Sequence, residues 1–239
     1  VSVRVSARAR RVRLVMHQRH GLEVVVPRGF DQSRLPAILE EKRDWLDRAW
    51  RRVDEHQRRL EAEPPRLPRR IVLPALGQEW EVEYRRGAAR ASVRESGGRL
   101  LVTGAGQDPE AVRAALCRWL SRKARMELVP WLARLGDGRG LCFTRVAIRQ
   151  QKSRWGSCSR AKTISLNARL LFLPPPLVEY VLLHELCHLS HLDHSPRFWR
   201  TLEKHSPEWR ELRAALREAD RWVPTWLDHA ALPFVHENG

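Results

Sequence analysis

A His-Glu-x-x-His pattern carries the clearest chemistry of this chain: His184, Glu185 and His188 stand in the segment His-Glu-Leu-Cys-His. Residues four apart lie on one face of an α-helix, about one turn from each other, so the two imidazoles can bind one metal ion. The glutamate beside the first imidazole can reach a water molecule on that ion. Catalytic zinc sites combine three protein ligands with an open position. The pattern therefore predicts a zinc-dependent hydrolase, with a peptidase as the leading kind.

The third ligand has to approach from a direction other than that of this helix. His194 follows His188 by six residues and can do so if the chain bends before Ser195-Pro196, a pair typical of a helix start. His191 lies almost in line with His184 on a continuous helix, and three ligands from one straight helix suit tetrahedral zinc poorly. The spacing favours His194, with His191 as the alternative.

The segment around these histidines is strongly apolar, which predicts a buried helix from the prolines at 174–176 to about residue 190. Its apolar residues are Leu177, Val178, Val181, Leu182, Leu183, Leu186 and Leu189. Histidines and a glutamate are costly to bury unless they are paired or bound to a metal. The setting therefore supports one zinc ion per chain.

The expected mechanism follows from these groups. Zinc lowers the pKa of water toward about 7 and polarises a carbonyl. Glu185 serves as the general base, which takes a proton and passes it to the leaving group. The developing oxyanion needs a donor, and Arg154, Tyr180 and Arg197 are candidates by residue type alone.

Length and composition narrow the class of protein. With 239 residues, of which 43% are apolar, the chain can bury one large core or two small ones. No apolar run approaches about 18 residues, so no membrane partner is expected. The first residues lack the apolar block of a signal peptide, so the expected location is cytoplasmic. The four cysteines form no C-x-x-C pair, which favours free thiols.

The net charge of +16 is carried mainly by arginine, because only five of the 44 basic residues are lysines. Such a surface attracts polyanions, so nucleic acid or a nucleotide is a candidate partner beside a peptide or protein substrate. The basic residues are nevertheless spread along the whole chain, which favours a bias of composition over a dedicated binding surface.

Periodicity and turn residues predict an α+β chain. Two strands are expected at 10–16 and 22–26, followed by a helix over about 33–60. A proline-rich linker at 63–68 precedes several short strands within 71–103. We therefore expect residues 1–107 to form a β-rich N-terminal region with one long helix.

The second expected region, 108–239, contains the metal pattern. Asp108-Pro109 is a typical helix start, and Pro130 is expected to kink or split the long helix that follows. Alternating residues at 143–150 and 163–173 predict further strands. This region then ends in the apolar helix with the histidines and in shorter helices after it.

Four blocks of sequence, in this order, resemble the YgjP-like metallopeptidase family, over about residues 10–222. They are Arg154-Trp155-Gly156-Ser157-Cys158-Ser159, Ile164-Ser165-Leu166-Asn167, the segment His184–His188, and His194-Ser195-Pro196-Arg197-Phe198-Trp199. These zincins are similar to the SprT-like and WLM peptidases. The resemblance implies zinc ligation by His184, His188 and His194, with Glu185 as the catalytic glutamate. It also implies a zincin-like core in which a small sheet packs on the helix of the metal pattern.

The resemblance further implies that an edge strand of that sheet binds substrate by strand addition, and we expect this strand within 163–171. Trp155 either shapes the substrate groove or packs in the core. Asp193 stands where relatives usually carry asparagine, and its carboxylate either orients a ligand or ends the helix.

Two other functions compete with a peptidase. The family also has an older label, UTP pyrophosphatase, which implies a metal-dependent nucleoside triphosphate pyrophosphohydrolase. Against it, the sequence shows no acidic cluster for magnesium and no Gly-rich phosphate loop. The third hypothesis is a basic nucleic-acid-associated protein with structural zinc, in line with the net charge.

Overall fold

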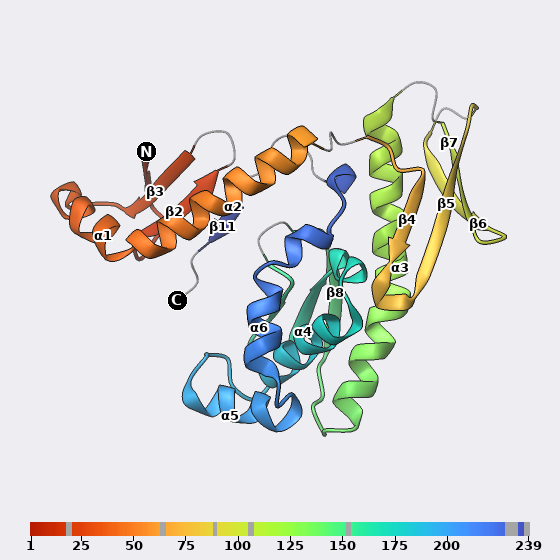
Figure 1. Ribbon diagram of the computed structural model, residues 1–239. Helices are drawn as coiled ribbons and strands as arrows, with labels where there is room; N and C mark the ends of the chain where they lie inside the picture. The colour runs from red at the N-terminus through yellow and green to blue at the C-terminus, as the bar shows by residue number, and fades with distance from the viewer. Residues whose placement is uncertain are drawn as a thin grey trace. The chain divides into compact units, whose positions relative to one another are not determined.

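The computed structural model describes residues 1–17, 21–62, 66–87, 90–104, 108–151, 154–227 and 234–236 (Figure 1). Contacts divide the chain into two compact units, Val1–Arg66 with Asp228–Gly239, and Leu67–Leu227. The division falls before Leu67 and not at residue 107, where the sequence predicted it. The reason is that the strands after Leu67 pack on the long helix that precedes the metal pattern.

The first unit contains a four-stranded sheet in the order β1-β3-β2-β11. Its strands are β1 (Ser2–Ser6), β2 (Arg13–His17), β3 (Gly21–Pro27) and β11 (Phe234–His236). β1 runs parallel to β3, whereas β2 is antiparallel to both of its neighbours. The two strands expected at 10–16 and 22–26 are present as β2 and β3, whereas the two outer strands, β1 and β11, were not predicted.

Helices cover one face of this sheet. The short η1 (Gln32–Arg34) leads into α1 (Leu35–Glu41) and α2 (Arg43–Ala62). The single helix expected over 33–60 is divided at Lys42, whose backbone leaves helical geometry (φ −100°, ψ 13°). Alternate strand residues meet α2 in a small core of Leu14, Met16, Leu22, Val24, Val26, Ala49 and Val53.

The second unit begins with a sheet in the order β4-β5-β7-β6. Its strands are β4 (Arg70–Leu73), β5 (Gln78–Arg85), β6 (Ser92–Ser96) and β7 (Arg99–Thr103), of which β5 and β7 are parallel. Alternate residues of β4 and β7 are buried, and they belong with residues of the next helix to the larger core of the molecule.

That helix is α3 (Pro109–Asp137), and Asp108 caps it by accepting the N–H of Glu110. It continues through Pro130, where a kink or a split was expected. Proline has no N–H to donate to the carbonyl of Met126. Because Met126 is 68% exposed, water can satisfy that carbonyl, and the helix runs on uninterrupted.

A three-stranded sheet in the order β8-β10-β9 follows. β8 (Arg145–Arg149) is parallel to β10 (Thr163–Asn167), and β9 (Gly156–Cys158) is antiparallel to it. A 3-10 turn, η3 (Ala168–Phe172), is entirely buried and leads from β10 into the helical part. β9 is thus one edge of this sheet, and it contacts the helix of the metal pattern.

The helical part comprises α4 (Pro175–Cys187), α5 (Pro196–His205), α6 (Trp209–Leu216) and the 3-10 turns η4 (Ala219–Trp222) and η5 (Thr225–Leu227). α5 and α6 both pack on α4. The architecture is α+β, as the sequence predicted, with a small sheet against the helix of the metal pattern. None of the helices in the described ranges is long and apolar enough to cross a membrane.

Candidate metal centre

The helix α4 brings the first two histidines together and then stops at the right place. Apolar residues surround it on all sides, so it lies buried in the larger core. After Cys187 the chain tightens into a turn in which both Ser190 and His191 donate their N–H groups to the carbonyl of Cys187. This turn ends α4 at Cys187, with His188 as the residue that follows its last turn. The chain can therefore bend back toward the helix.

The return of the chain places His194 against α4. Asp193 accepts the N–H of Ser195 at 3.4 Å, which shapes the bend before α5. The same hydrogen bonds to Ser195 hold the pKa of Asp193 below its usual range. The carboxylate of Asp193 therefore accepts a hydrogen bond within the bend that leads into α5.

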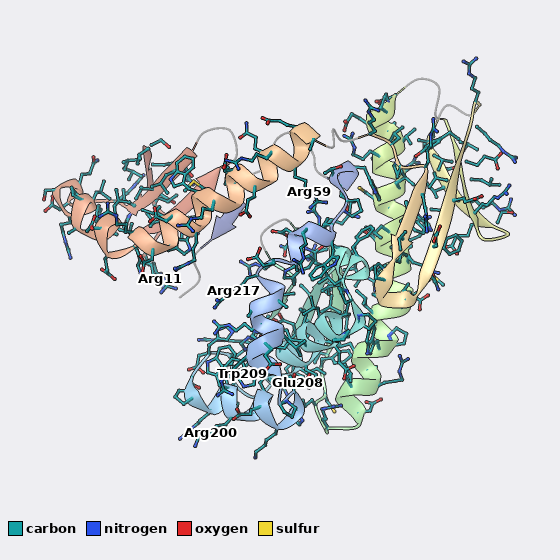
Figure 2. The ribbon with its side chains drawn as sticks, in the orientation of Figure 1. Arg11, Arg59, Arg200, Glu208, Trp209 and Arg217 are labelled. Carbon is teal, nitrogen blue, oxygen red and sulfur yellow. The ribbon has the colours of Figure 1, made fainter. Side chains whose placement is uncertain are left out.

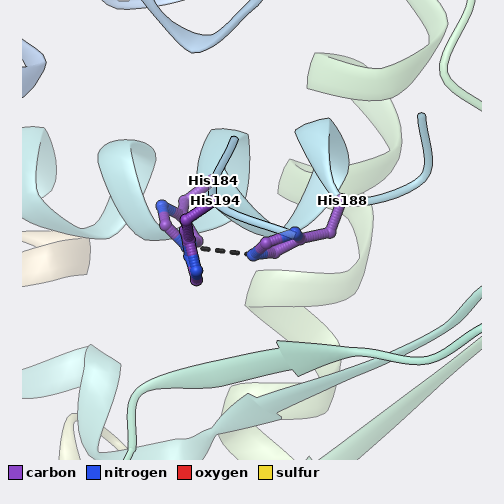
Figure 3. Close-up of side chains that lie close together, drawn as sticks. All are labelled: His184, His188 and His194. Carbon is purple, nitrogen blue, oxygen red and sulfur yellow. Dashed lines mark hydrogen bonds between the residues drawn. The ribbon is translucent and has the colours of Figure 1, made fainter. Parts of the chain in front are cut away.

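Three imidazole nitrogens converge at this point (Figure 3). His184 Nε2 lies 3.2 Å from His188 Nε2 and 3.1 Å from His194 Nε2. Two nitrogens about 2.0–2.1 Å from one zinc ion, at a tetrahedral angle, are about 3.3 Å apart. The three side chains are therefore spaced as ligands of a single ion, and the structure brings His194 rather than His191 into the cluster.

The protonation of these rings also suits a metal. His188 Nδ1 lies 2.8 Å from the carbonyl of His191 and donates its proton there, which leaves the lone pair on Nε2. Burial, followed by the neighbouring imidazoles, lowers the pKa of His184 to about 3. Burial likewise lowers the pKa of His188 and His194. All three rings are neutral at neutral pH, the form that binds metals.

Phe198 supports all three imidazoles at once, a role that the sequence analysis missed. Its ring is fully buried, and its centroid lies 4.9 Å from that of His184, 4.5 Å from that of His188 and 4.9 Å from that of His194. The signal was present in the sequence, because Phe198 and Leu202 form an apolar i, i+4 pair at the start of the helix that follows His194.

Glu185 lies beside the three imidazoles under the edge strand β9. It is only 4% exposed, and within the described ranges its Oε2 has no hydrogen-bond partner. A Cβ atom added to Gly156 would lie 2.5 Å from Glu185 Oε1. The absence of a side chain thus allows β9 to pass directly over this carboxylate. Burial raises the pKa of Glu185 to about 8, and the charge of Arg154 acts in the opposite direction. The charge of a metal dication held by the imidazoles would also lower this pKa and favour the carboxylate.

The edge of the sheet differs from the expected one. The substrate-binding edge was predicted within 163–171, but the strand in that range is β10, which is paired on both sides, with β8 and with β9. A central strand has no free backbone groups for a further partner. The edge next to the metal pattern is β9, formed by the Trp-Gly-Ser-Cys block whose chemistry the sequence did not reveal.

The backbone N–H and C=O groups of successive residues in β9 point alternately toward β10 and away from it. The carbonyl of Trp155 accepts the N–H of Asn167, and the N–H of Ser159 donates to the carbonyl of Thr163. In an antiparallel ladder the intervening residues point their N–H and C=O groups the other way. Gly156 and Cys158 therefore present free backbone groups at the open edge, where no strand of the described ranges pairs with them.

Asn167 fixes the chain segment that leads into β9. Its Nδ2 donates to the carbonyls of Gln151 and Arg154, the latter at 2.9 Å, and its Oδ1 accepts the N–H of Arg169 at 3.1 Å. The residue is 4% exposed. Asn167, named in the sequence analysis only as part of the family blocks, is thus a clamp on the edge strand.

The other residues named from the sequence lie at different distances from the cluster. Tyr180 is buried one turn before His184, with ring centroids 6.0 Å apart, and burial raises its pKa to about 12. Trp155 is partly buried against the larger core. Arg197 is exposed on the first turn of α5, and among the described contacts none joins its guanidinium to the imidazoles.

Two residues near the cluster were not anticipated. Trp199 stacks on the ring of His194, with centroids 5.5 Å apart. The guanidinium of Arg213, on α6, lies 4.8 Å from the centroid of the Trp199 ring. Its positive charge contributes to the lowered pKa of His184 and of His194. Arg213 lies on a separate helix, α6, so nothing in the sequence indicates that it comes close to the histidines.

The donor set fits a divalent metal: three neutral imidazoles, with the nitrogens of His188 and His194 3.2 Å and 3.1 Å from that of His184, and a buried carboxylate on the residue after His184. Imidazole nitrogens suit a divalent first-row metal such as zinc, and three protein ligands leave one coordination position of the ion open. His184, His188 and His194 are the residues that would hold it.

Comparisons with known proteins identify the family of the chain. The model of the family "YgjP-like, metallopeptidase domain" matches residues 10–219. The crystal structure of the metallopeptidase zymogen of Pyrococcus abyssi abylysin is similar, with 32% identity over 36% of this chain and 89% of that chain, at a TM-score of 0.34. No curated protein matches the chain. Because the family model spans most of the sequence, the chain belongs to the YgjP-like metallopeptidase family.

Proposed function

We propose that this protein is a zinc-dependent metallopeptidase that holds one zinc ion per chain through His184, His188 and His194. The observation that carries the proposal is the convergence of three imidazoles, with His184 Nε2 lying 3.2 Å from His188 Nε2 and 3.1 Å from His194 Nε2, on and against the helix that carries the buried Glu185. Zinc bound by three imidazoles supplies a Lewis acid that activates water and polarises the carbonyl of the scissile bond. The remaining steps depend on the chain's own side chains.

Glu185 is the proton carrier of the proposed reaction. Its carboxylate stands next to the imidazoles, and its Oε2 has no partner among the described residues, so this oxygen is available to an attacking water. The carboxylate takes the proton of that water and later delivers it to the leaving amine, which is the role of a general base and acid. Gly156 lies so close to this carboxylate that any side chain at that position would collide with it.

The substrate is held as an additional strand on β9. Gly156 and Cys158 offer their N–H and C=O groups at the open edge, directly above Glu185. An extended peptide that pairs with this edge would bring its backbone carbonyl beside the carboxylate and the imidazoles. Main-chain pairing of this kind favours unfolded or extended segments of a protein over folded ones.

The test compares wild type with Glu185→Gln on an unstructured protein substrate. We expect Glu185→Gln to keep one zinc per chain and to lose peptide hydrolysis by at least about 10²-fold, because a positioned general base contributes about 10²–10⁴-fold. Zinc is measured by mass spectrometry and cleavage by the release of new amino termini. If the variant cleaves as fast as wild type, the assignment is wrong. Release of pyrophosphate from UTP that depends on Glu185, without peptide cleavage, would establish the competing function instead.

A further inference from the structure

The proposed reaction needs a positive group where negative charge develops on the substrate carbonyl. Glu185 occupies the β9 side of the centre, under Gly156. The other side is formed by α5 and α6, which pack on α4 and bring aromatic rings against the histidines. An oxyanion is most stable away from the carboxylate and toward a cation, so the stabilising group belongs on the α5–α6 side.

The α5–α6 side is a stack of rings that ends at the metal centre. His194 lies on Trp199, and Trp199 lies on Trp209 with centroids 4.4 Å apart and planes 20° from parallel. Trp209 is labelled at the start of α6 in Figure 2. This stack forms a rigid apolar platform next to His194, and two arginines of α6 lie on it.

The two arginines differ in their partners. Arg210 lies over Trp209, with its guanidinium 4.5 Å from the ring centroid, and pairs with Glu203 at 2.6 Å. Arg213 lies over Trp199, the ring that contacts His194, and the described part of the chain provides no carboxylate partner for it. The unneutralised cation is therefore the one nearer the histidines, and it is exposed to incoming substrate.

We propose that Arg213 binds the oxyanion of the tetrahedral intermediate, as a catalytic residue of the α5–α6 side. The proposal rests on the proposed function of the site. The guanidinium lies over Trp199 in a cation–π contact and carries several N–H donors in one plane. These donors can bind the negatively charged oxygen on the tetrahedral carbon of the intermediate. Trp199, over which the guanidinium lies, stacks on the ring of His194, so the guanidinium is on the α5–α6 side of the centre.

This assignment separates Arg213 from the candidates named by residue type. Arg154 lies at the β9 side, where its charge acts on Glu185. Arg197 has no described contact with the imidazoles. Tyr180 lies on the same side as Arg213, but its ring is 3% exposed, within the core. Arg213 is the exposed cation that lies over Trp199, the ring that stacks on His194.

The test measures equilibrium binding of a blocked phosphonamidate dipeptide, a stable tetrahedral anion, to zinc-loaded protein by titration calorimetry. Wild type is compared with Arg213→Gln, Arg213→Lys and the matched control Arg210→Gln, which removes a stacked arginine of the same helix that is already neutralised. We expect Arg213→Gln to weaken binding by about 10²–10³-fold, the loss typical of one oxyanion donor. The affinity of Arg213→Lys for the phosphonamidate should lie between those of wild type and Arg213→Gln. Arg210→Gln should bind it as tightly as wild type does.

Several outcomes would overturn the proposal. Unchanged binding in Arg213→Gln, or an equal loss in Arg210→Gln, would exclude a specific contact. With peptide substrates, a rise in KM confined to peptides with a free carboxyl terminus, and absent for amidated ones, would assign Arg213 to substrate recognition instead of the oxyanion. The proposed function fails separately: Arg213-dependent binding of the phosphonamidate without any peptide cleavage would leave the anion site in place and remove the peptidase assignment.

Discussion

The two sides of the metal centre are built in different ways. On one side, His184, Glu185 and His188 belong to a single buried helix, so their relative positions follow from helix geometry alone. On the other, Gly156 belongs to a three-residue edge strand whose position depends on Asn167, eleven residues further along the chain. The spacing of residues within one helix can be predicted from the sequence. The distance between β9 and the carboxylate of Glu185 instead depends on contacts between separate elements.

His194→Ala is expected to have the largest effect, because it removes one of three ligands. Zinc affinity should fall by more than the roughly 10–100-fold that the loss of an outer partner costs, and peptide cleavage should be lost. Zinc is followed by competition with a chelator. His205→Ala, at the last residue of α5, is the matched control and should bind zinc as wild type does. Retention of zinc by His194→Ala under the same competition would contradict the ligand set.

Gly156→Ala tests the other side of the centre. The new Cβ would stand 2.5 Å from Glu185 Oε1, so either the carboxylate or β9 has to move. A misplacement of about 1 Å costs on the order of 10²-fold in rate, and we expect that loss in kcat with zinc content unchanged. The measurement is steady-state kinetics alongside metal analysis.

The control for Gly156→Ala is Gly138→Ala, where the nearest atom to a new Cβ is the carbonyl oxygen of Arg134 at 3.6 Å. This variant should match wild type in kcat and in zinc content. A kcat for Gly156→Ala equal to that of Gly138→Ala would show that the close approach to Glu185 has no catalytic consequence.

Two substitutions of Asn167 distinguish the hydrogen bonds that hold the segment before β9 from the hydrogen bond that caps η3. Asn167→Asp keeps an oxygen to accept the N–H of Arg169 but removes the two hydrogen bonds donated to Gln151 and Arg154, whereas Asn167→Ala removes all three. Leaving buried carbonyls unpaired costs about 1–3 kcal/mol. We expect both variants to lower Tm and to raise KM about tenfold or less, with zinc retained.

The comparison between the two variants decides what Asn167 does. Equal losses in Asn167→Asp and Asn167→Ala would assign the effect to the donated bonds that hold the segment before β9. A wild-type KM in Asn167→Asp would instead assign it to the cap of η3, and the clamp would be disproved.

The fold and the site were predictable to different degrees. The α+β class, the apolar helix of the metal pattern and the preference for His194 over His191 all follow from local spacing and helix signals, and the structure has these features. Pro130 shows the limit of such signals, because its cost depends on the exposure of Met126, which is a property of the folded molecule.

The elements that the sequence missed are those defined by distant contacts. β9 is only three residues long, and its role as an edge follows from its pairing with β10, not from its composition. Phe198 and Arg213 act through packing between α4, α5 and α6. Residues 63–65 of the proline-rich segment that was predicted as a linker lie outside the described residues. The division of the chain before Leu67 follows from the packing of the later strands on α3.

His191→Ala should have the smallest effect and sharpens the choice of the third ligand. His191 contributes to the centre through its carbonyl, which accepts the proton of His188 Nδ1 at 2.8 Å, and a backbone carbonyl survives the substitution. Changes away from buried contacts usually stay within about 0.5 kcal/mol, so kcat/KM and zinc affinity should change by roughly twofold or less. The measurement pairs chelator competition with kinetics, next to His194→Ala. A loss of zinc in His191→Ala as large as that in His194→Ala would mean that the turn after Cys187 rearranges on metal binding and that the imidazole of His191 is a ligand.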